Sequence, residues 1–147
     1  MSTETADKIR ILYIAEGIAT GGRSGHGRSS DGRLDVQLSV PASMGGDDGP
    51  GTNPEQLFAT GYAACYLSAL GSIAKNEKLP ADDATVTARV GIGPTGAGKF
   101  GFEIELLVSM PSVTDRAEAK RLANLAHQRC PYSNAVKGNV DVTVTVV

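Results

Sequence analysis

Hydrophobic and polar residues alternate along four stretches of the chain, and this alternation predicts β-strands. The stretches are residues 34–40, 85–90, 100–110 and 140–146. An apolar segment at residues 9–19 predicts a further strand, which runs into a glycine-rich ribbon ending at Arg33. The Asp31-Gly32 pair within that ribbon is typical of a hairpin turn.

Two helices are expected between these strands. Asn53-Pro54-Glu55-Gln56 has the residues of a helix start, with asparagine as N-cap and proline in the first helical position. This helix should extend to about Glu77, and small residues occur on nearly every face of it, which favours a central buried position or a subunit interface. Thr114 is the expected N-cap of a second helix that continues to Arg129 and is ended by Pro131.

The order of these elements is typical of an α+β fold with antiparallel sheets around a long central helix. Because the strands do not alternate with helices, a Rossmann sheet is disfavoured. A length of 147 residues and an apolar content of 41% predict a single domain over residues 1–147. Residues 1–8 are polar, and we expect them to be peripheral or disordered.

Composition and charge narrow the choice of partners. The net charge is −2, with no block of like charges, so neither nucleic acid nor an anionic membrane is indicated. The first ten residues lack an apolar leader, and no later stretch is expected to reach the roughly 18 apolar residues that cross a bilayer. We therefore expect a cytoplasmic protein.

The two cysteines are the first candidates for chemistry, since an isolated pair in a cytoplasmic protein is more often catalytic than structural. Cys65 lies in the middle of the long helix, where burial alone would raise its pKa and leave it inert. It therefore needs a nearby cation in order to react. Cys130 lies at the end of the second helix, where the dipole disfavours a thiolate and suits a resolving role. If Pro131 instead opens a new helix, this dipole argument reverses.

The glycine-rich ribbon contains the candidate cations Arg23, Arg28 and Arg33, although most such arginines are solvated surface charges. Glycine neighbours allow close backbone approach, so an arginine among them can be held against a buried site. Glu55 is the expected counter-charge. It stands ten residues from Cys65, about 15 Å along a helix, so a long arginine must bridge the two or a second subunit must contribute.

Two other motifs, for a phosphate-binding loop and a zinc site, give weaker evidence for a function. Residues 22–29 approximate a phosphate-binding loop, but Arg28 replaces the essential lysine, and a turn follows where a helix should begin. His127 and Cys130 have the spacing of two zinc ligands, and His26 and Cys65 could supply the other two. No C-x-x-C pair supports such a zinc site. Surface or loop positions are the simpler expectation for both histidines.

Four motifs together resemble the organic hydroperoxide resistance proteins, the Ohr branch of the OsmC/Ohr family. In chain order they are Ala19-Thr20-Gly21-Gly22-Arg23-Ser24-Gly25, Gly51-Thr52-Asn53-Pro54-Glu55-Gln56-Leu57-Phe58-Ala59, Gly61-Tyr62-Ala63-Ala64-Cys65, and Cys130-Pro131-Tyr132-Ser133-Asn134-Ala135 with Gly138-Asn139-Val140. Tyr66 departs from the family, which often has phenylalanine there.

The resemblance implies a peroxidatic Cys65, a resolving Cys130, and an activating Arg23 paired with Glu55. Leu57, Phe58, Tyr62 and Tyr66 would then contact the organic part of a hydroperoxide. It further implies an intertwined homodimer with interface sites, recycling by dihydrolipoyl groups on lipoylated proteins, and no cofactor or metal. The alternatives are the sister OsmC branch and a non-enzymatic redox-sensing module.

Overall fold

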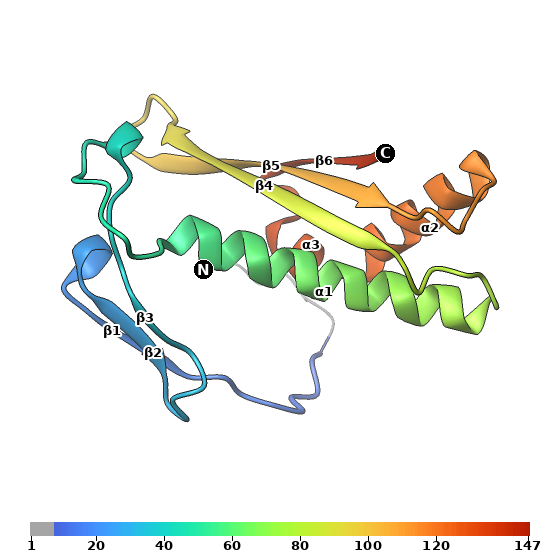
Figure 1. Ribbon diagram of the computed structural model, residues 1–147, viewed down its shortest axis with the longest axis horizontal. Helices are drawn as coiled ribbons and strands as arrows, with labels where there is room; N and C mark the ends of the chain where they lie inside the picture. The colour runs from blue at the N-terminus through green and yellow to red at the C-terminus, as the bar shows by residue number, and fades with distance from the viewer. Residues whose placement is uncertain (1–7) are drawn as a thin grey trace. The chain divides into compact units, whose positions relative to one another are not determined.

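The computed structural model describes residues 8–147, and its chain divides after Asn53 into a first unit and a second unit. The α+β class is confirmed, with two small sheets and a long helix (Figure 1). The expectation that residues 1–8 are peripheral falls outside the described residues except at Lys8, which is exposed.

The first unit contains a three-stranded antiparallel sheet in the order β1-β2-β3, formed by β1 (Gly17–Thr20), β2 (His26–Ser29) and β3 (Asp35–Gln37). Two 3-10 turns, η1 (Gly22–Ser24) and η2 (Ala42–Met44), complete it. The predicted hairpin at Asp31-Gly32 is confirmed between β2 and β3, where Gly32 has φ 76°.

Two strands of this unit are shorter than the sequence predicted. The strand expected at residues 9–19 is confirmed only for Gly17–Thr20, and residues 8–16 lie outside any helix or strand. The strand expected at 34–40 forms over Asp35–Gln37 and is followed by the buried Leu38. An apolar segment becomes a strand only where a neighbouring strand accepts its hydrogen bonds, and β1 is limited to its four pairings with β2.

The glycine-rich ribbon folds into a tight turn around η1. Gly21 has φ 73°, and a Cβ on Gly25 would lie 1.7 Å from the carbonyl oxygen of Thr20. Both positions therefore require glycine for the packing of the ribbon on its own backbone. Because the strand β2 follows η1, no helix begins where a phosphate-binding loop would need one.

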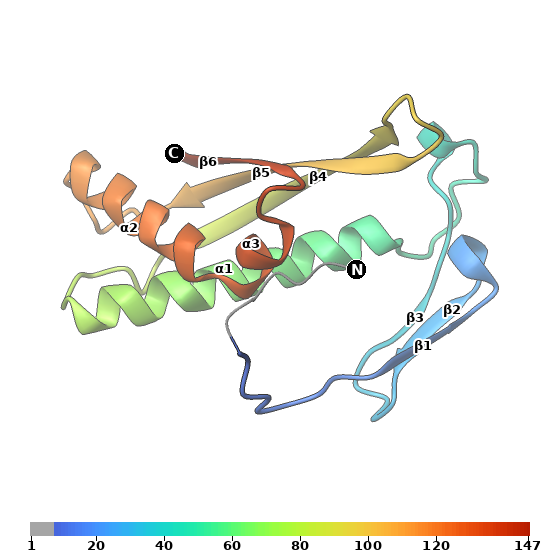
Figure 2. The same cartoon turned by 180° about the vertical axis from the view of Figure 1, so that it is seen from behind.

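The second unit places three helices against one face of another sheet (Figure 1 and, from behind, Figure 2). Its elements are α1 (Pro54–Asn76), β4 (Thr85–Pro94), β5 (Phe100–Ser109), α2 (Arg116–Arg129), α3 (Pro131–Val136) and β6 (Asp141–Val146). The predicted start of α1 at Pro54 is confirmed. The predicted N-cap of α2 was wrong by one residue, because Asp115 rather than Thr114 accepts bonds from the amides of Ala117 and Glu118.

One strand pairing corrects the expectation of purely antiparallel sheets. The sheet order is β4-β5-β6, and β4 pairs antiparallel with β5, but β6 runs parallel to β5 with Leu106 opposite Val144. The cause is the α2–α3 connection, which returns the chain to the starting end of β5. A crossover of this kind produces parallel strands, whereas a tight hairpin produces antiparallel ones.

The core of the second unit lies between α1, α2 and the sheet. Its fully buried side chains include Tyr66, Leu70, Leu106 and Leu122. By length and composition alone α1 could also cross a membrane, which corrects the expectation that no stretch is long enough. A single helix of this kind is weak evidence for a membrane span, and α1 packs here against β4 and α2.

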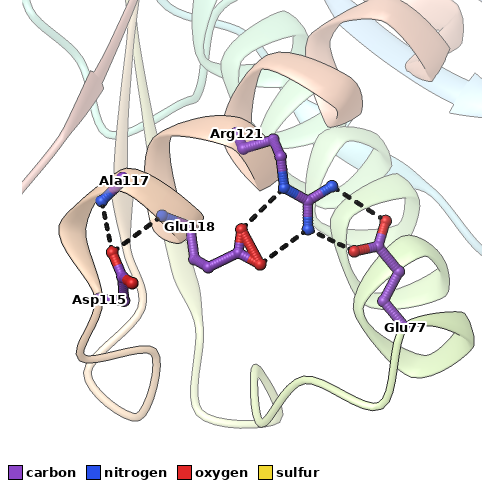
Figure 3. Close-up of polar contacts among 5 residues, drawn as sticks. All are labelled: Glu77, Asp115, Ala117, Glu118 and Arg121. Atoms are coloured by element: carbon purple, nitrogen blue, oxygen red, sulfur yellow. Dashed lines mark hydrogen bonds and ion pairs between the residues drawn. The ribbon is translucent and has the colours of Figure 1, made fainter.

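An ion-pair network ties the C-terminal end of α1 to α2 (Figure 3). Arg121 donates to both carboxylate oxygens of Glu77, one of them at 3.2 Å, and to both oxygens of Glu118 at 2.8 and 3.0 Å. These hydrogen bonds lower the pKa of each carboxyl group. The network thus holds the C-terminal end of α1 against α2.

Candidate functional site

Cys65 projects from the middle of α1 and is half-buried. Burial is the largest cause that raises the pKa of its thiol, and the neighbouring Cys130 raises it further. The backbone amide of Tyr132 donates a hydrogen bond to the sulfur and opposes part of this increase. A thiolate at Cys65 therefore requires a compensating cation.

Cys130 occupies the junction between α2 and α3 and is fully buried. It is at once the C-cap of α2 and the N-cap of α3, because Pro131 opens a new helix. The alternative considered from the sequence therefore holds, and a position at a helix C-terminus no longer marks Cys130 as the poorer attacker. Accessibility separates the two thiols instead, since only Cys65 is partly exposed.

The two cysteines interact directly within the second unit. Both are free thiols, and Cys130 lies near enough to raise the pKa of Cys65. They come from segments 65 positions apart in sequence, brought together by the packing of α3 on α1. A pair of thiols that interact in this way is a candidate for a disulfide.

An aromatic cluster lies one to two turns before Cys65. Phe58 is 6.1 Å from Tyr62, 5.4 Å from Phe102 and 5.5 Å from Tyr132, measured between ring centroids. Phe58 and Tyr62 were predicted from the sequence, whereas Phe102 and Tyr132 were not. Tyr132 could have been found from its place directly after Cys130-Pro131, whereas Phe102 carries no local signal.

The side chains expected to contact substrate differ in exposure. Leu57 and Phe58 are half-buried, whereas Tyr62 and Tyr66 are fully buried. Tyr66 donates its hydroxyl to the carbonyl oxygen of Ala123 at 2.6 Å, so the hydroxyl that distinguishes it from phenylalanine is used inside the core.

Glu55 and Arg23 lie in different units. Glu55 is in the first turn of α1 and is only 8% exposed, which is rare for a carboxylate. Arg23 lies in η1 of the first unit and is half-buried. Neither of them is a fully solvated surface charge, in contrast to Arg33, whose side chain is 92% exposed.

His127 has a different environment from the one predicted. The expectation of a surface or loop position is wrong, because His127 lies in the last turn of α2, is half-buried and bonds Ser133 through Nδ1 at 2.8 Å. Burial, followed by the charge of Lys137, lowers its pKa. His127 and Ser133 line a cavity of about 260 Å³ together with Lys137 and Asp141.

Comparison with known proteins identifies the family. Residues 45–145 match the family described as OsmC-like protein. An organic hydroperoxide resistance protein of Xanthomonas axonopodis pv. citri is 49% identical over 138 residues, which cover 93% of this chain and 96% of that protein.

Solved structures agree with this match. The organic hydroperoxide resistance protein of Elizabethkingia anophelis is 46% identical with a TM-score of 0.89, over 94% of this chain and 98% of that one. The organic hydroperoxide resistance protein OhrB of Bacillus subtilis is 41% identical with a TM-score of 0.84, over 93% of this chain and all of that one. The chain therefore belongs to the OsmC family, in the branch of the organic hydroperoxide resistance proteins.

Proposed function

We propose that this protein is a thiol peroxidase that reduces organic hydroperoxides to alcohols. The observation that carries the proposal is the pair of free, interacting thiols, one partly exposed and one buried, in a chain that belongs to this family. Peroxide reduction by a cysteine requires an accessible attacking sulfur, and a second thiol within reach allows the oxidised sulfur to be resolved as a disulfide.

In the proposed reaction the Cys65 thiolate attacks the distal oxygen of the hydroperoxide. The O–O bond breaks, the alcohol leaves with a proton, and Cys65 becomes a sulfenic acid. The thiol of Cys130 then displaces the hydroxyl as water, and a Cys65–Cys130 disulfide forms. A dithiol reopens the disulfide by exchange and is itself oxidised to a disulfide.

Arg23 is proposed to supply the charge that Cys65 needs, with Glu55 as its partner. Support comes from the chemistry of the cysteine site, where burial raises the pKa of Cys65. A guanidinium remains charged in such surroundings and can also donate to a peroxide oxygen. A carboxylate as buried as Glu55 is normally paired with a cation.

The proposed substrate is an organic hydroperoxide whose carbon chain contacts Leu57 and Phe58, with Tyr62 and Tyr66 packed behind them. The aromatic cluster around Phe58 supports an apolar substrate group over hydrogen peroxide. Dihydrolipoamide or a lipoylated protein is the proposed reductant, and no metal or organic cofactor takes part. Free thiols at both cysteines agree with a proposed cytoplasmic location.

A homodimer is proposed as the working form. Seven of the nine large hydrophobic side chains exposed in the described part of the chain belong to the first unit, including Leu12 at 83% and Ile14 at 78%. Exposed apolar residues in such number mark an interaction surface. A second copy that covers residues 8–18 would bury them, and sedimentation velocity measures whether the dimer forms.

A turnover assay with cumene hydroperoxide and dihydrolipoamide tests the proposal. The wild-type protein should turn over many times, Cys65→Ser should be inactive, and Cys130→Ser should be oxidised once and then stall. Turnover by Cys65→Ser at the wild-type rate contradicts the assignment. A single oxidation without turnover indicates a redox sensor, and a preference for hydrogen peroxide indicates chemistry of the sister OsmC branch.

A further inference from the structure

A chain of hydrogen bonds inside the second unit connects the segments that carry the two cysteines. His127 Nδ1 lies 2.8 Å from Ser133 Oγ, and Ser133 Oγ lies 2.6 Å from the Tyr62 hydroxyl. His127 belongs to α2, Ser133 to α3 and Tyr62 to α1. We propose that these three hydrogen-bonded side chains, His127, Ser133 and Tyr62, form a positioning chain that holds Cys130 against Cys65 for disulfide closure. This inference rests on the proposed function.

The first argument is the spacing around Cys130. His127 precedes Cys130 by three residues and Ser133 follows it by three, so their hydrogen bond spans the α2–α3 junction with Cys130 at its apex. Cys130 itself has an extended backbone, φ −64° and ψ 125°, which interrupts the helical hydrogen bonding there. The His127–Ser133 bond therefore fixes the angle between the two helices, and with it the position of the Cys130 sulfur.

The second argument is the spacing before Cys65. Tyr62 precedes Cys65 by three residues in α1, so their side chains leave the helix on neighbouring positions of one face. Burial raises the pKa of Tyr62, the hydrogen bond with Ser133 opposes this increase, and the charges of Cys130 and Cys65 raise the pKa further. The Ser133–Tyr62 bond thus connects the clamped junction to the helix that carries the other cysteine.

The third argument is burial. Tyr62 is fully buried and Ser133 is 4% exposed, so each hydroxyl depends on the chain for its hydrogen bonds. Removal of one member leaves a buried polar group without its partner, which costs more than the bond itself contributes. The geometry of closure is demanding, since the sulfurs must meet at about 2 Å with a restricted dihedral angle.

Disulfide closure needs no proton from His127, Ser133 or Tyr62. In closure, the S–O bond of the Cys65 sulfenic acid breaks, the S–S bond forms, and the Cys130 proton leaves with the hydroxyl as water. His127, Ser133 and Tyr62 are therefore positioning residues and not catalytic ones. Their effect should appear in the closure step and in the stability of the disulfide, and not in the attack on the peroxide.

The cavity beside His127 adds a dependence on pH. Lys137, after α3, and Asp141, on β6, are the charged groups that line this cavity with His127, and the titratable Tyr62 is linked to the ring through Ser133. A neutral ring can accept the Ser133 proton at Nδ1, which leaves Ser133 to accept from Tyr62. A protonated ring donates at Nδ1, so the hydrogen-bonded set then has one proton more than it has acceptors, and either the Ser133 or the Tyr62 hydroxyl proton is left without one.

The test is the equilibrium of the Cys65–Cys130 disulfide with dithiothreitol, measured by thiol alkylation and intact mass. Ser133→Ala and His127→Leu should each weaken the disulfide about tenfold, which is about 30 mV. His127→Asn keeps a hydrogen-bonding atom near the Nδ1 position and cannot titrate, so it should restore the wild-type value. Tyr66→Phe deletes an equally buried hydroxyl that is not hydrogen-bonded to His127, Ser133 or Tyr62, and it controls for a general loss of stability.

The pH profile provides a second readout. His127→Asn keeps both cysteines, so any proton taken up by a thiol affects both pH profiles equally, and the difference between the two profiles reports the ring of His127. The wild-type disulfide should weaken on acidification with a midpoint below 6.5, and His127→Asn should lack this inflection. Rapid-quench oxidation by one equivalent of cumene hydroperoxide, with dimedone as a trap, should show slower closure in Ser133→Ala and an unchanged rate of sulfenic acid formation.

Several outcomes overturn the inference. Disulfide equilibria of Ser133→Ala and His127→Leu within twofold of the wild type contradict it, as does an equal loss in Tyr66→Phe. A wild-type protein that diamide does not oxidise to the Cys65–Cys130 disulfide also contradicts it. If the wild-type protein fails to reduce hydroperoxides but the variants still weaken its disulfide, the proposed function is wrong and the positioning chain stands.

Discussion

Two glycines of α1 have different surroundings, and alanine at each position should affect stability differently. A Cβ on Gly61 would lie 2.4 Å from the Tyr132 hydroxyl oxygen and 3.1 Å from the ring carbon that bears it. A Cβ on Gly71 meets nothing within 4 Å. Both positions lie inside one helix, where Gly61 is half-buried against Tyr132 and Gly71 is exposed.

The magnitudes follow from helix propensity and from packing. Alanine is favoured over glycine inside a helix by about 1 kcal/mol, so Gly71→Ala should raise the free energy of unfolding by roughly that amount. Gly61→Ala has the same gain in helix propensity, but the Tyr132 hydroxyl must move away by about 1 Å to reach ordinary van der Waals contact. Its ring is held by Phe58 and Tyr62, and overpacking of this kind costs about 1–3 kcal/mol.

Urea unfolding followed by circular dichroism measures the difference. Gly61→Ala should be less stable than Gly71→Ala by about 1–3 kcal/mol, with both proteins compared at one concentration because association would shift the midpoint. A Gly61→Ala protein as stable as Gly71→Ala would show that Tyr132 is free to move away. The proposed packing of α3 on α1 would then be too loose to hold Cys130.

Three further predictions concern the helices around the site. Asp115→Ala should lower the free energy of unfolding by about 1 kcal/mol in the same assay, because the amides of Ala117 and Glu118 lose their cap, and Asp115→Asn should retain most of it. Arg121→Met should lower the melting temperature at low salt and by less at high salt, and an effect independent of salt would contradict the electrostatic role of the network. Burial lowers the pKa of His127 in the folded state below its usual value of 6.5. Between the folded-state pKa and 6.5 the unfolded protein binds more protons at this residue, so the stability should fall as the pH drops through that range. The urea midpoint should show this fall in the wild type and a smaller one in His127→Asn.

The sequence by itself determined the features that are encoded locally. The Asn53-Pro54 helix start, the turn at Asp31-Gly32 and the alternating strands follow from backbone preferences and from side-chain period, which act over a few neighbouring residues. The family is also a property of the sequence, because its motifs are short and keep their order. Cys65 and Cys130 could be named as candidates for the same reason.

The tertiary structure decided what depends on distant segments. The parallel pairing of β6 with β5 results from the path of α2 and α3, which no window of residues contains. The place of Phe102 in the aromatic cluster and the hydrogen bonds of His127 with Ser133 and of Ser133 with Tyr62 join residues that only packing brings together. Burial likewise belongs to the whole fold, and it is burial that makes Cys130 inaccessible and raises the pKa of Cys65.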